Sequence, residues 1–235
     1  MEYYYRKING KVYRARIEYD EEPLNPREFE GNRCKLYMWW NGYDLGDKKP
    51  YNSPLEYILV ALMEKYLPDV NCEDITVSKM IMALNSKASD KIKIMPIFVY
   101  EHSGITISTG NDYPYNDRWD GGLGGYAIIE REKEELYHDD EWAKAADIIT
   151  AEVNEYDMYL TGSCYGYIED TYIGGGKWEE NTENCWGYLT DKYGDELVVE
   201  ILGETITEEE AIKACEEYDR KENAKAEYGL YLMAM

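Results

Sequence analysis

The feature that most constrains the fold lies at the N-terminus, where two β-prone runs flank the dipeptide Asn9-Gly10. The runs are YYYRKI at 3–8 and KVYRARIEY at 11–19. Asn-Gly tolerates the positive backbone angles of a two-residue turn, and such turns join antiparallel strands. The sequence therefore predicts an N-terminal β-hairpin, and hence a sheet that contains antiparallel strands.

The rest of the chain mixes helix and strand patterns without a regular βαβ alternation, which indicates an α+β fold. Apolar spacing and capping residues predict about four helices, over 54–66, 77–85, 139–160 and a C-terminal segment that opens with a capping box from Thr207 to Glu210. Further strands are predicted over 35–40, 96–101, 104–109, 126–130 and 197–202, with a polar loop over 110–125. We expect a mixed, largely antiparallel sheet with hairpins.

Two short segments in the second half of the chain resemble each other. They are CYGYIED at 164–170 and CWGYLTD at 185–191, and they flank the glycine run 174–176. We interpret them as arms of an antiparallel hairpin, in which each central Gly lets a facing ring lie over the backbone.

The formal charge of −23 is concentrated in the later part of the chain. Residues 1–95 hold 15 Lys/Arg and 15 Asp/Glu, whereas residues 96–235 hold 10 and 33. An anionic surface repels nucleic acid and anionic membranes, and it attracts basic protein surfaces or cations. We expect a single domain over 1–235, and if it forms two lobes, they should divide where the charge changes.

The predicted helix over 139–160 has a one-sided charge, with seven acids against Lys144 alone. Such a face repels itself, so it serves either solubility, which is the commoner cause, or contact with a basic partner. The predicted partner-binding face consists of Asp140, Glu141, Asp147, Glu152, Glu155 and Asp157.

Cysteine content and hydropathy indicate a cytoplasmic protein. The five cysteines include no C-x-x-C, and the start MEYYYRK lacks the apolar stretch of a secretion signal. The longest purely apolar run is the six residues 58–63, where a membrane-spanning helix needs about 20. No membrane span and no cofactor are expected.

The candidate segment for chemistry is 100–125, which contains His102, one of only two histidines. His102 and Asp120 are the catalytic candidates, since a His beside a carboxylate can act as a general base. The predicted ligand or loop site also includes Tyr100, Ser103 and Trp119. Asn, Asp and Gly form turns for structural reasons alone, and that interpretation is favoured here. No metal site is predicted, because the calcium-loop spacing fails with Arg118 at a ligand position.

Several short motifs follow one another in order: Y-D-L-G-D at 43–47, Y-E-H-S-G-I at 100–105, W-D-G-G at 119–122, Y-L-T-G at 159–162, Y-G-Y at 165–167 and C-W-G-Y at 185–188. Together they resemble a family of small proteins common in bacteriophages and other mobile elements, over most of residues 33–190. The family has no established activity, so the resemblance implies a setting but no mechanism. Where relatives often have Cys-Pro-Trp-Asp, this chain has Asp117-Arg118-Trp119-Asp120, which excludes a nucleophilic Cys at that position.

Charge and resemblance together predict a phage or mobile-element accessory protein that acts in the host bacterial cytoplasm and is not an enzyme. Its expected partner is a host protein with a basic surface, a restriction or CRISPR nuclease, which it would inhibit as a DNA mimic without binding nucleic acid itself. Duplex DNA presents one negative charge per roughly 1.7 Å, and carboxylates can imitate that array. Two alternatives stay open: a small-ligand or metal-binding enzyme centred on His102, Trp119 and Asp120, and a virion or assembly component.

Overall fold

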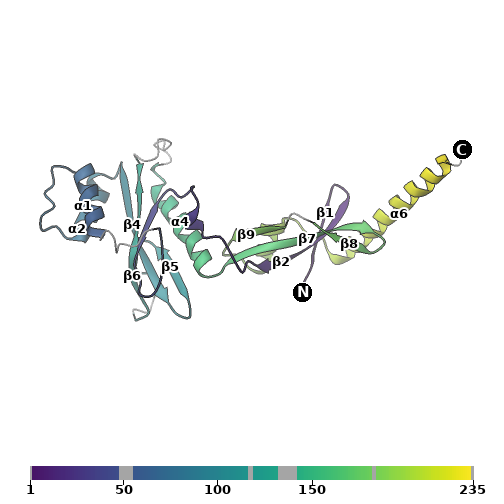
Figure 1. Ribbon diagram of the computed structural model, residues 1–235, viewed down its shortest axis with the longest axis horizontal. Coiled ribbons are helices and arrows are strands. Elements are labelled where there is room, and N and C mark those ends of the chain that lie inside the picture. The colour runs from purple at the N-terminus through teal and green to yellow at the C-terminus, as the bar shows by residue number, and fades with distance from the viewer. Residues whose placement is uncertain (1, 48–54, 116–118, 132–141, 182–183, 234–235) are drawn as a thin grey trace. The chain divides into compact units, whose positions relative to one another are not determined.

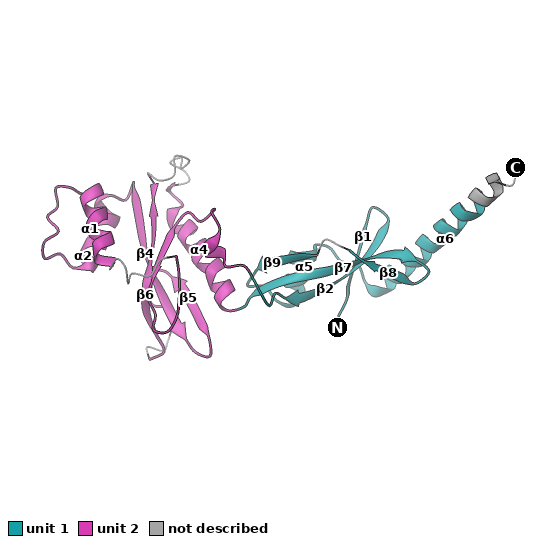
Figure 2. Cartoon of the chain, viewed as in Figure 1, with its two compact units in different colours: residues 1–23, 162–235 teal, residues 24–161 magenta. Residues whose placement is uncertain are grey.

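The computed structural model describes residues 2–47, 55–115, 119–131, 142–181 and 184–233. The chain forms two compact units: unit 1 comprises residues 1–23 and 162–235, and unit 2 comprises residues 24–161 (Figure 2). Each unit contains one antiparallel sheet, and the described residues form five α-helices. The predicted α+β class with largely antiparallel pairing is therefore confirmed, with two sheets in place of one.

The sheet of unit 1 has five strands: β1 (Tyr4–Ile8), β2 (Lys11–Tyr19), β7 (Cys164–Gly174), β8 (Lys177–Glu180) and β9 (Cys185–Leu189) (Figure 1). Their order is β1-β2-β7-β8, and β9 also pairs with β7. The predicted N-terminal hairpin is confirmed, because β1 and β2 are antiparallel and the turn residues Asn9 and Gly10 have φ angles of 52° and 80°.

Two helices cover opposite faces of this sheet. Helix α5 (Gly194–Leu202) packs against Ala15, and α6 (Glu208–Met233) packs against Val12. Positions 12 and 15 of β2 differ by an odd number of residues, so their side chains point to opposite faces. Both residues are fully buried, so each face of β2 has its own small core.

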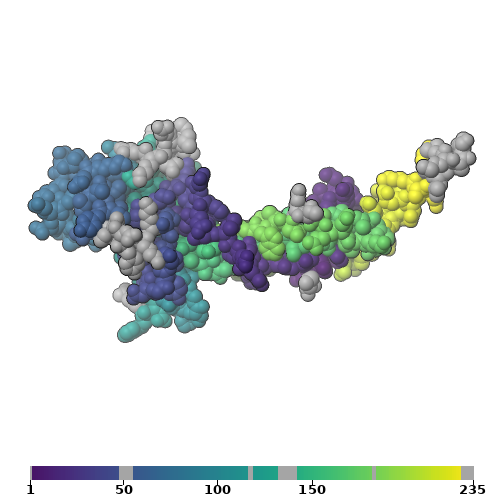
Figure 3. Space-filling model, in the orientation of Figure 1, coloured from purple at the N-terminus to yellow at the C-terminus, as the bar shows by residue number. Residues whose placement is uncertain are grey.

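The C-terminal helix α6 begins as predicted. The Thr207 side chain accepts a hydrogen bond from the Glu210 backbone N–H over 3.3 Å, and the Glu210 carboxylate accepts one from the Thr207 N–H over 2.9 Å. Farther along this helix, Glu217 and Lys221 form an ion pair of 2.7 Å one turn apart. Residues 220–228 are all exposed, and this yellow part of the helix extends beyond the rest of unit 1 (Figure 3).

The sheet of unit 2 has the order β3-β6-β4-β5, formed by β3 (Lys35–Met38), β4 (Ile92–Glu101), β5 (Ile105–Thr109) and β6 (Gly121–Glu130). Helix α4 (Ala145–Leu160) packs over one core, which includes Ile129, whereas α1 (Leu55–Tyr66) and α2 (Val77–Lys87) pack over another, which includes Ile128. Because consecutive residues of a strand point to opposite faces, these helices sandwich the sheet. A 3-10 helix, Pro26–Glu28, precedes β3.

The two similar segments lie in β7 and β9, which are antiparallel neighbours with Tyr165 opposite Tyr188. The predicted antiparallel pairing of the copies is therefore confirmed, but they are not the two arms of one hairpin, because the glycine turn joins β7 to β8 and β9 follows β8. A Cβ on Gly166 would collide with the indole ring of Trp186, so this glycine does let a ring lie over the backbone. Gly187 has open space at its Cβ position and a φ of 86°, so that part of the prediction is wrong and this glycine serves the backbone conformation.

The predicted strand over 197–202 is wrong, because these residues form the last part of α5. Val198, Ile201 and Leu202 are buried, whereas Val199 is 60% exposed. Burial at intervals of three and four residues is the period of a helix, and a strand would alternate instead. The helix ends at Gly203, whose φ of 73° suits a glycine.

The predicted loop over 110–125 is too long, because β6 begins at Gly121. A Cβ at Gly125 would lie 2.5 Å from the Tyr37 carbonyl oxygen, and one at Gly124 would collide with the Val99 side chain. Gly124 and Gly125 therefore allow a close approach inside the sheet, which is a common reason for glycine in a strand.

The units do not divide where the charge changes along the chain. Unit 1 holds 11 Lys/Arg and 23 Asp/Glu, and unit 2 holds 14 and 25. Because residues 1–23 fold with 162–235, the acidic later segments are shared between the units. The expected neutral lobe over 1–95 is therefore not a folded unit, and both units are acidic.

Candidate functional site

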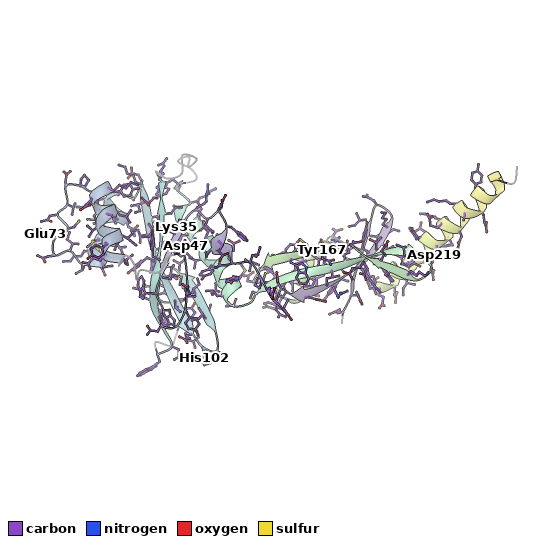
Figure 4. The ribbon with its side chains drawn as sticks, in the orientation of Figure 1. Lys35, Asp47, Glu73, His102, Tyr167 and Asp219 are labelled. Carbon is purple, nitrogen blue, oxygen red and sulfur yellow. The ribbon has the colours of Figure 1, made fainter. Side chains whose placement is uncertain are left out.

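The predicted loop site lies at the tip of the β4–β5 hairpin, where His102 is labelled in Figure 4. The turn residue Ser103 has a φ of 61°, and the Glu101 backbone N–H donates to the Asp120 carbonyl oxygen over 2.7 Å. This contact brings Asp120 beside the turn: its Oδ2 atom lies 3.8 Å from His102 Nδ1. The two side chains are 47% and 68% exposed, so water screens the pair.

Aromatic rings extend from this tip. The Tyr100 ring stacks on His102 and on Tyr115, with centroids 6.0 and 5.1 Å apart, and Trp119 is 93% exposed. The predicted proximity of the loop residues is therefore correct. The distance of 3.8 Å between His102 and Asp120 is longer than a hydrogen bond. The arrangement therefore fits a structural loop better than a general base.

Sequence reasoning missed Glu101, which anchors the same hairpin. Its carboxylate accepts hydrogen bonds from Trp40 Nε1 over 2.7 Å and from the Tyr43 hydroxyl over 3.1 Å. The one signal that could have found it is its place between Tyr100 and His102 in the Y-E-H-S-G motif. Part of that motif is thus structural.

The predicted acidic face of α4 is interrupted. Asp147 and Glu155 are exposed, whereas Glu152 and Asp157 are partly buried and hydrogen-bonded within unit 2. Outside the described residues lie Asp140 and Glu141. Glu152 and Asp157 are therefore not part of an exposed partner-binding face, because their carboxylates accept bonds from backbone N–H groups of Arg33 and Ile107.

Glu152 belongs to a buried ion-pair network centred on Arg27, whose side chain is 2% exposed. The guanidinium donates to both carboxylate oxygens of Asp47 over 2.8 and 2.9 Å, and to Glu152 Oε2 over 2.8 Å. Burial lowers the pKa of Arg27, but its bonds to Asp47 and Glu152 more than offset that effect and raise it. Burial raises the pKa of Cys34, whose protonated thiol donates to Glu152 over 3.1 Å. The network is a structural clamp.

The Y-D-L-G-D motif supplies one partner of this clamp. Its last residue, Asp47, binds Arg27, and the preceding Gly46 donates its N–H to the Tyr156 hydroxyl over 3.1 Å. A Cβ at Gly46 would lie 2.6 Å from the Leu36 carbonyl oxygen, so only glycine fits there. This motif therefore builds the fold of unit 2.

Asp157 caps the start of β5. Its Oδ1 accepts hydrogen bonds from the Thr106 hydroxyl over 2.7 Å and the Ile107 N–H over 2.6 Å. Burial raises the pKa of this carboxyl above the usual 3.8, and the two hydrogen bonds oppose the shift. The folded state binds the proton more tightly than the unfolded chain, so this group costs stability as pH rises from 3.8 through its folded pKa.

We expect Asp157→Asn to be at least as stable as the unaltered protein at about pH 7, because the amide oxygen accepts the same two bonds without a buried charge. Asp157→Ala removes both bonds and should lose about 1–3 kcal/mol. Urea unfolding from about pH 4 to about pH 8 checks both, and the advantage of Asp157→Asn should grow with pH. An Asn variant that is less stable near neutrality would show that the charge itself stabilises the fold.

The surface around α5 in unit 1 is almost entirely acidic. Residues 179–210 contain 11 acids against Lys192 alone. All ten described acids of this segment are exposed: Glu179, Glu180, Asp191, Asp195, Glu196, Glu200, Glu204, Glu208, Glu209 and Glu210. Lys192 contacts Asp191 and Glu196 over 3.5 and 4.0 Å. We call Asp195, Glu196, Glu200 and Glu204 the α5 face.

Large apolar side chains lie beside the α5 face. Tyr193 is 83% exposed and Val199 is 60% exposed. Tyr193 also lines a groove of about 340 Å³ together with Tyr4, Tyr19 and Tyr165. Exposed tyrosines are common anchors of protein–protein interfaces. Sequence reasoning missed this surface, because 197–202 resembled a strand.

No protein-family model, curated protein or solved structure matches this chain. Within the described ranges, no helix is long and apolar enough to cross a membrane. In the same part of the chain, no three His, Cys, Asp or Glu side chains gather where they could hold a metal ion.

Proposed function

We propose that this chain is a non-enzymatic accessory protein of a bacteriophage or other mobile element, which inhibits a host nucleic-acid-binding defence protein. The α5 face is the surface that binds the basic partner. The partner is a restriction or CRISPR nuclease in the host cytoplasm, and the carboxylates occupy the groove that otherwise holds DNA phosphates.

The observation that carries the proposal is that the surface around α5 combines many acidic side chains, few basic ones and exposed apolar side chains. Ten exposed carboxylates lie in one segment that contains a single lysine. One positive charge in that segment cannot balance ten negative ones. Solubility alone favours surfaces on which both signs are mixed and large apolar side chains are few. Tyr193 and Val199 break that rule at the centre of this segment.

The His102 loop supports the alternative of an enzyme less well. A general base works best when burial or a neighbour adjusts its pKa and when it lies within hydrogen-bond reach of its partner. His102 and Asp120 are exposed and 3.8 Å apart.

A competition experiment tests the proposal. We expect the purified protein to displace duplex DNA from a restriction or CRISPR nuclease, and to inhibit cleavage, more strongly at low than at moderate salt. Screening by salt shortens the range of the attraction from about 30 Å at 0.01 M to about 8 Å at 0.15 M ionic strength. Failure to bind or inhibit a panel of such nucleases at both salt concentrations would contradict it.

A further inference from the structure

A second groove of unit 1 lies between α6 and the sheet, with a volume of about 420 Å³. The rings of Tyr5, Tyr172 and Trp178 line it from β1, β7 and β8. The α6 side of the groove is lined by Ala211, Ile212, Cys215, Glu216 and Asp219, the last of which is labelled in Figure 4. The volume falls within the range of small-molecule sites. We call this site the α6 groove.

The three rings meet at steep angles. Tyr172 and Trp178 are cross-strand neighbours with centroids 5.2 Å apart and planes at 63°. Tyr5 and Trp178 have centroids 6.3 Å apart and planes at 53°. The rings therefore pack at tilted and edge-to-face angles and not as a flat stack, and together they border the α6 groove with aromatic side chains from three strands.

The charged residues that line the α6 groove are both acidic, and the Arg14 guanidinium beside the Trp178 ring is paired with Asp170 over 2.6 Å. The two lining acids are Glu216 and Asp219. Asp219 is held in place, because its two oxygens accept hydrogen bonds from the Tyr172 hydroxyl over 2.8 Å and the Gly175 N–H over 3.0 Å. The Tyr172 hydroxyl in turn accepts from the Gly176 N–H over 3.0 Å. The carboxylate thus contributes charge while both of its oxygens already have donors.

Trp178 already attracts a cation from the protein itself. The guanidinium carbon of Arg14 lies 4.8 Å from the Trp178 ring centroid and 4.7 Å from that of Tyr3. Tryptophan gives the strongest cation–π attraction of the aromatic side chains.

We propose that the α6 groove binds a methylated ammonium group, either of a small choline-like molecule or of a methylated lysine side chain. Such a cation needs ring faces and nearby negative charge but few or no hydrogen-bond acceptors. The α6 groove offers this combination, whereas a guanidinium would need acceptors arranged as a fork. The α6 groove is separate from the α5 face, so this proposal does not depend on whether that face binds a nuclease.

Calorimetric titration of the full chain with choline and with tetramethylammonium chloride tests the site. The neutral isostere 3,3-dimethylbutan-1-ol has the same shape as choline, and we expect its binding to be weaker by about 2-fold to 30-fold. A trimethyllysine peptide, compared with its unmodified form, shows whether the group arrives on a side chain. Equal binding of choline and its isostere, or no binding of any cation at millimolar concentration, would overturn the proposal.

Variants and a chemical readout locate the binding. Trp178→Phe and Glu216→Gln should each weaken binding of choline, whereas Glu209→Gln, exposed on the same helix outside the α6 groove, should leave it unchanged. In the unaltered protein, choline should slow alkylation of the half-buried Cys215 but not of the exposed Cys185. Equal protection of both thiols would place the ligand elsewhere and reject the site.

Discussion

Replacing Arg27 by alanine is expected to lower the free energy of unfolding of unit 2 by about 3–5 kcal/mol. The guanidinium is the only cation within hydrogen-bond reach in the described contacts of Asp47 and Glu152, and both carboxylates are nearly buried at 9% and 12% exposure. Removing it leaves two buried charges without a counterion, and these cost more than the original pair contributed. Urea denaturation followed by tryptophan fluorescence measures the loss.

The matched control for this variant is Lys79→Ala, because Lys79 is an exposed cation on α2 of the same unit. Its effect should stay within about 0.5 kcal/mol. Arg27→Lys keeps the charge but loses the bidentate contact with Asp47. Its loss of unfolding free energy should therefore lie between those of Arg27→Ala and Lys79→Ala. A loss of under about 1 kcal/mol for Arg27→Ala would show that the network is not a clamp.

Neutralising the α5 face should weaken binding to a nuclease that the unaltered protein inhibits. Three exposed ion pairs at about 0.2–1 kcal/mol each correspond to a loss of about 3-fold to 150-fold for Glu196→Gln/Glu200→Gln/Glu204→Gln. The loss should shrink as salt rises, because these charges are screened. Competition with labelled duplex DNA at several salt concentrations measures it.

A triple variant in unit 2 with the same change in net charge separates a specific effect of the α5 face from a general effect of the acidity of the protein. Glu56→Gln/Glu64→Gln/Asp69→Asn also removes three exposed negative charges. If binding depends on the α5 face, this control should bind as the unaltered protein does. Equal losses in both triple variants would show that net charge and not the α5 face governs binding, and no loss in either would contradict the proposed surface and favour solubility as the role of these acids.

Local patterns predicted most of the secondary structure. The Asn9-Gly10 turn, the capping box at Thr207 and the helical spacing before Gly162 each depend on a few neighbouring residues, and each is confirmed. The segment 197–202 was mistaken for a strand, because a short apolar run fits a buried strand and a buried helix equally well. Only the packing of Val198 and Ile201 on the sheet distinguishes the two.

The candidate site was predicted less completely. His102 and Asp120 fall in one predicted segment and do lie near each other, but strand β5 separates them in the sequence, and it is the pairing of β4 with β6 that brings them together. The inward turn of Glu152 did not follow, because its partner Arg27 lies 125 positions away in the sequence. An acid on a predicted helix looks the same in sequence whether it faces water or a buried guanidinium.

By itself, the sequence determined the α+β class, the antiparallel hairpins, and the anionic character that favours a basic or cationic partner. Only the tertiary structure decided where that charge is available. It buries Glu152 and Asp157, exposes the acids of the α5 face, and encloses Tyr5, Tyr172 and Trp178 beside Asp219. The physical reason is that turns and caps depend on residues a few positions apart, whereas burial and ion pairing depend on segments brought together from distant parts of the chain.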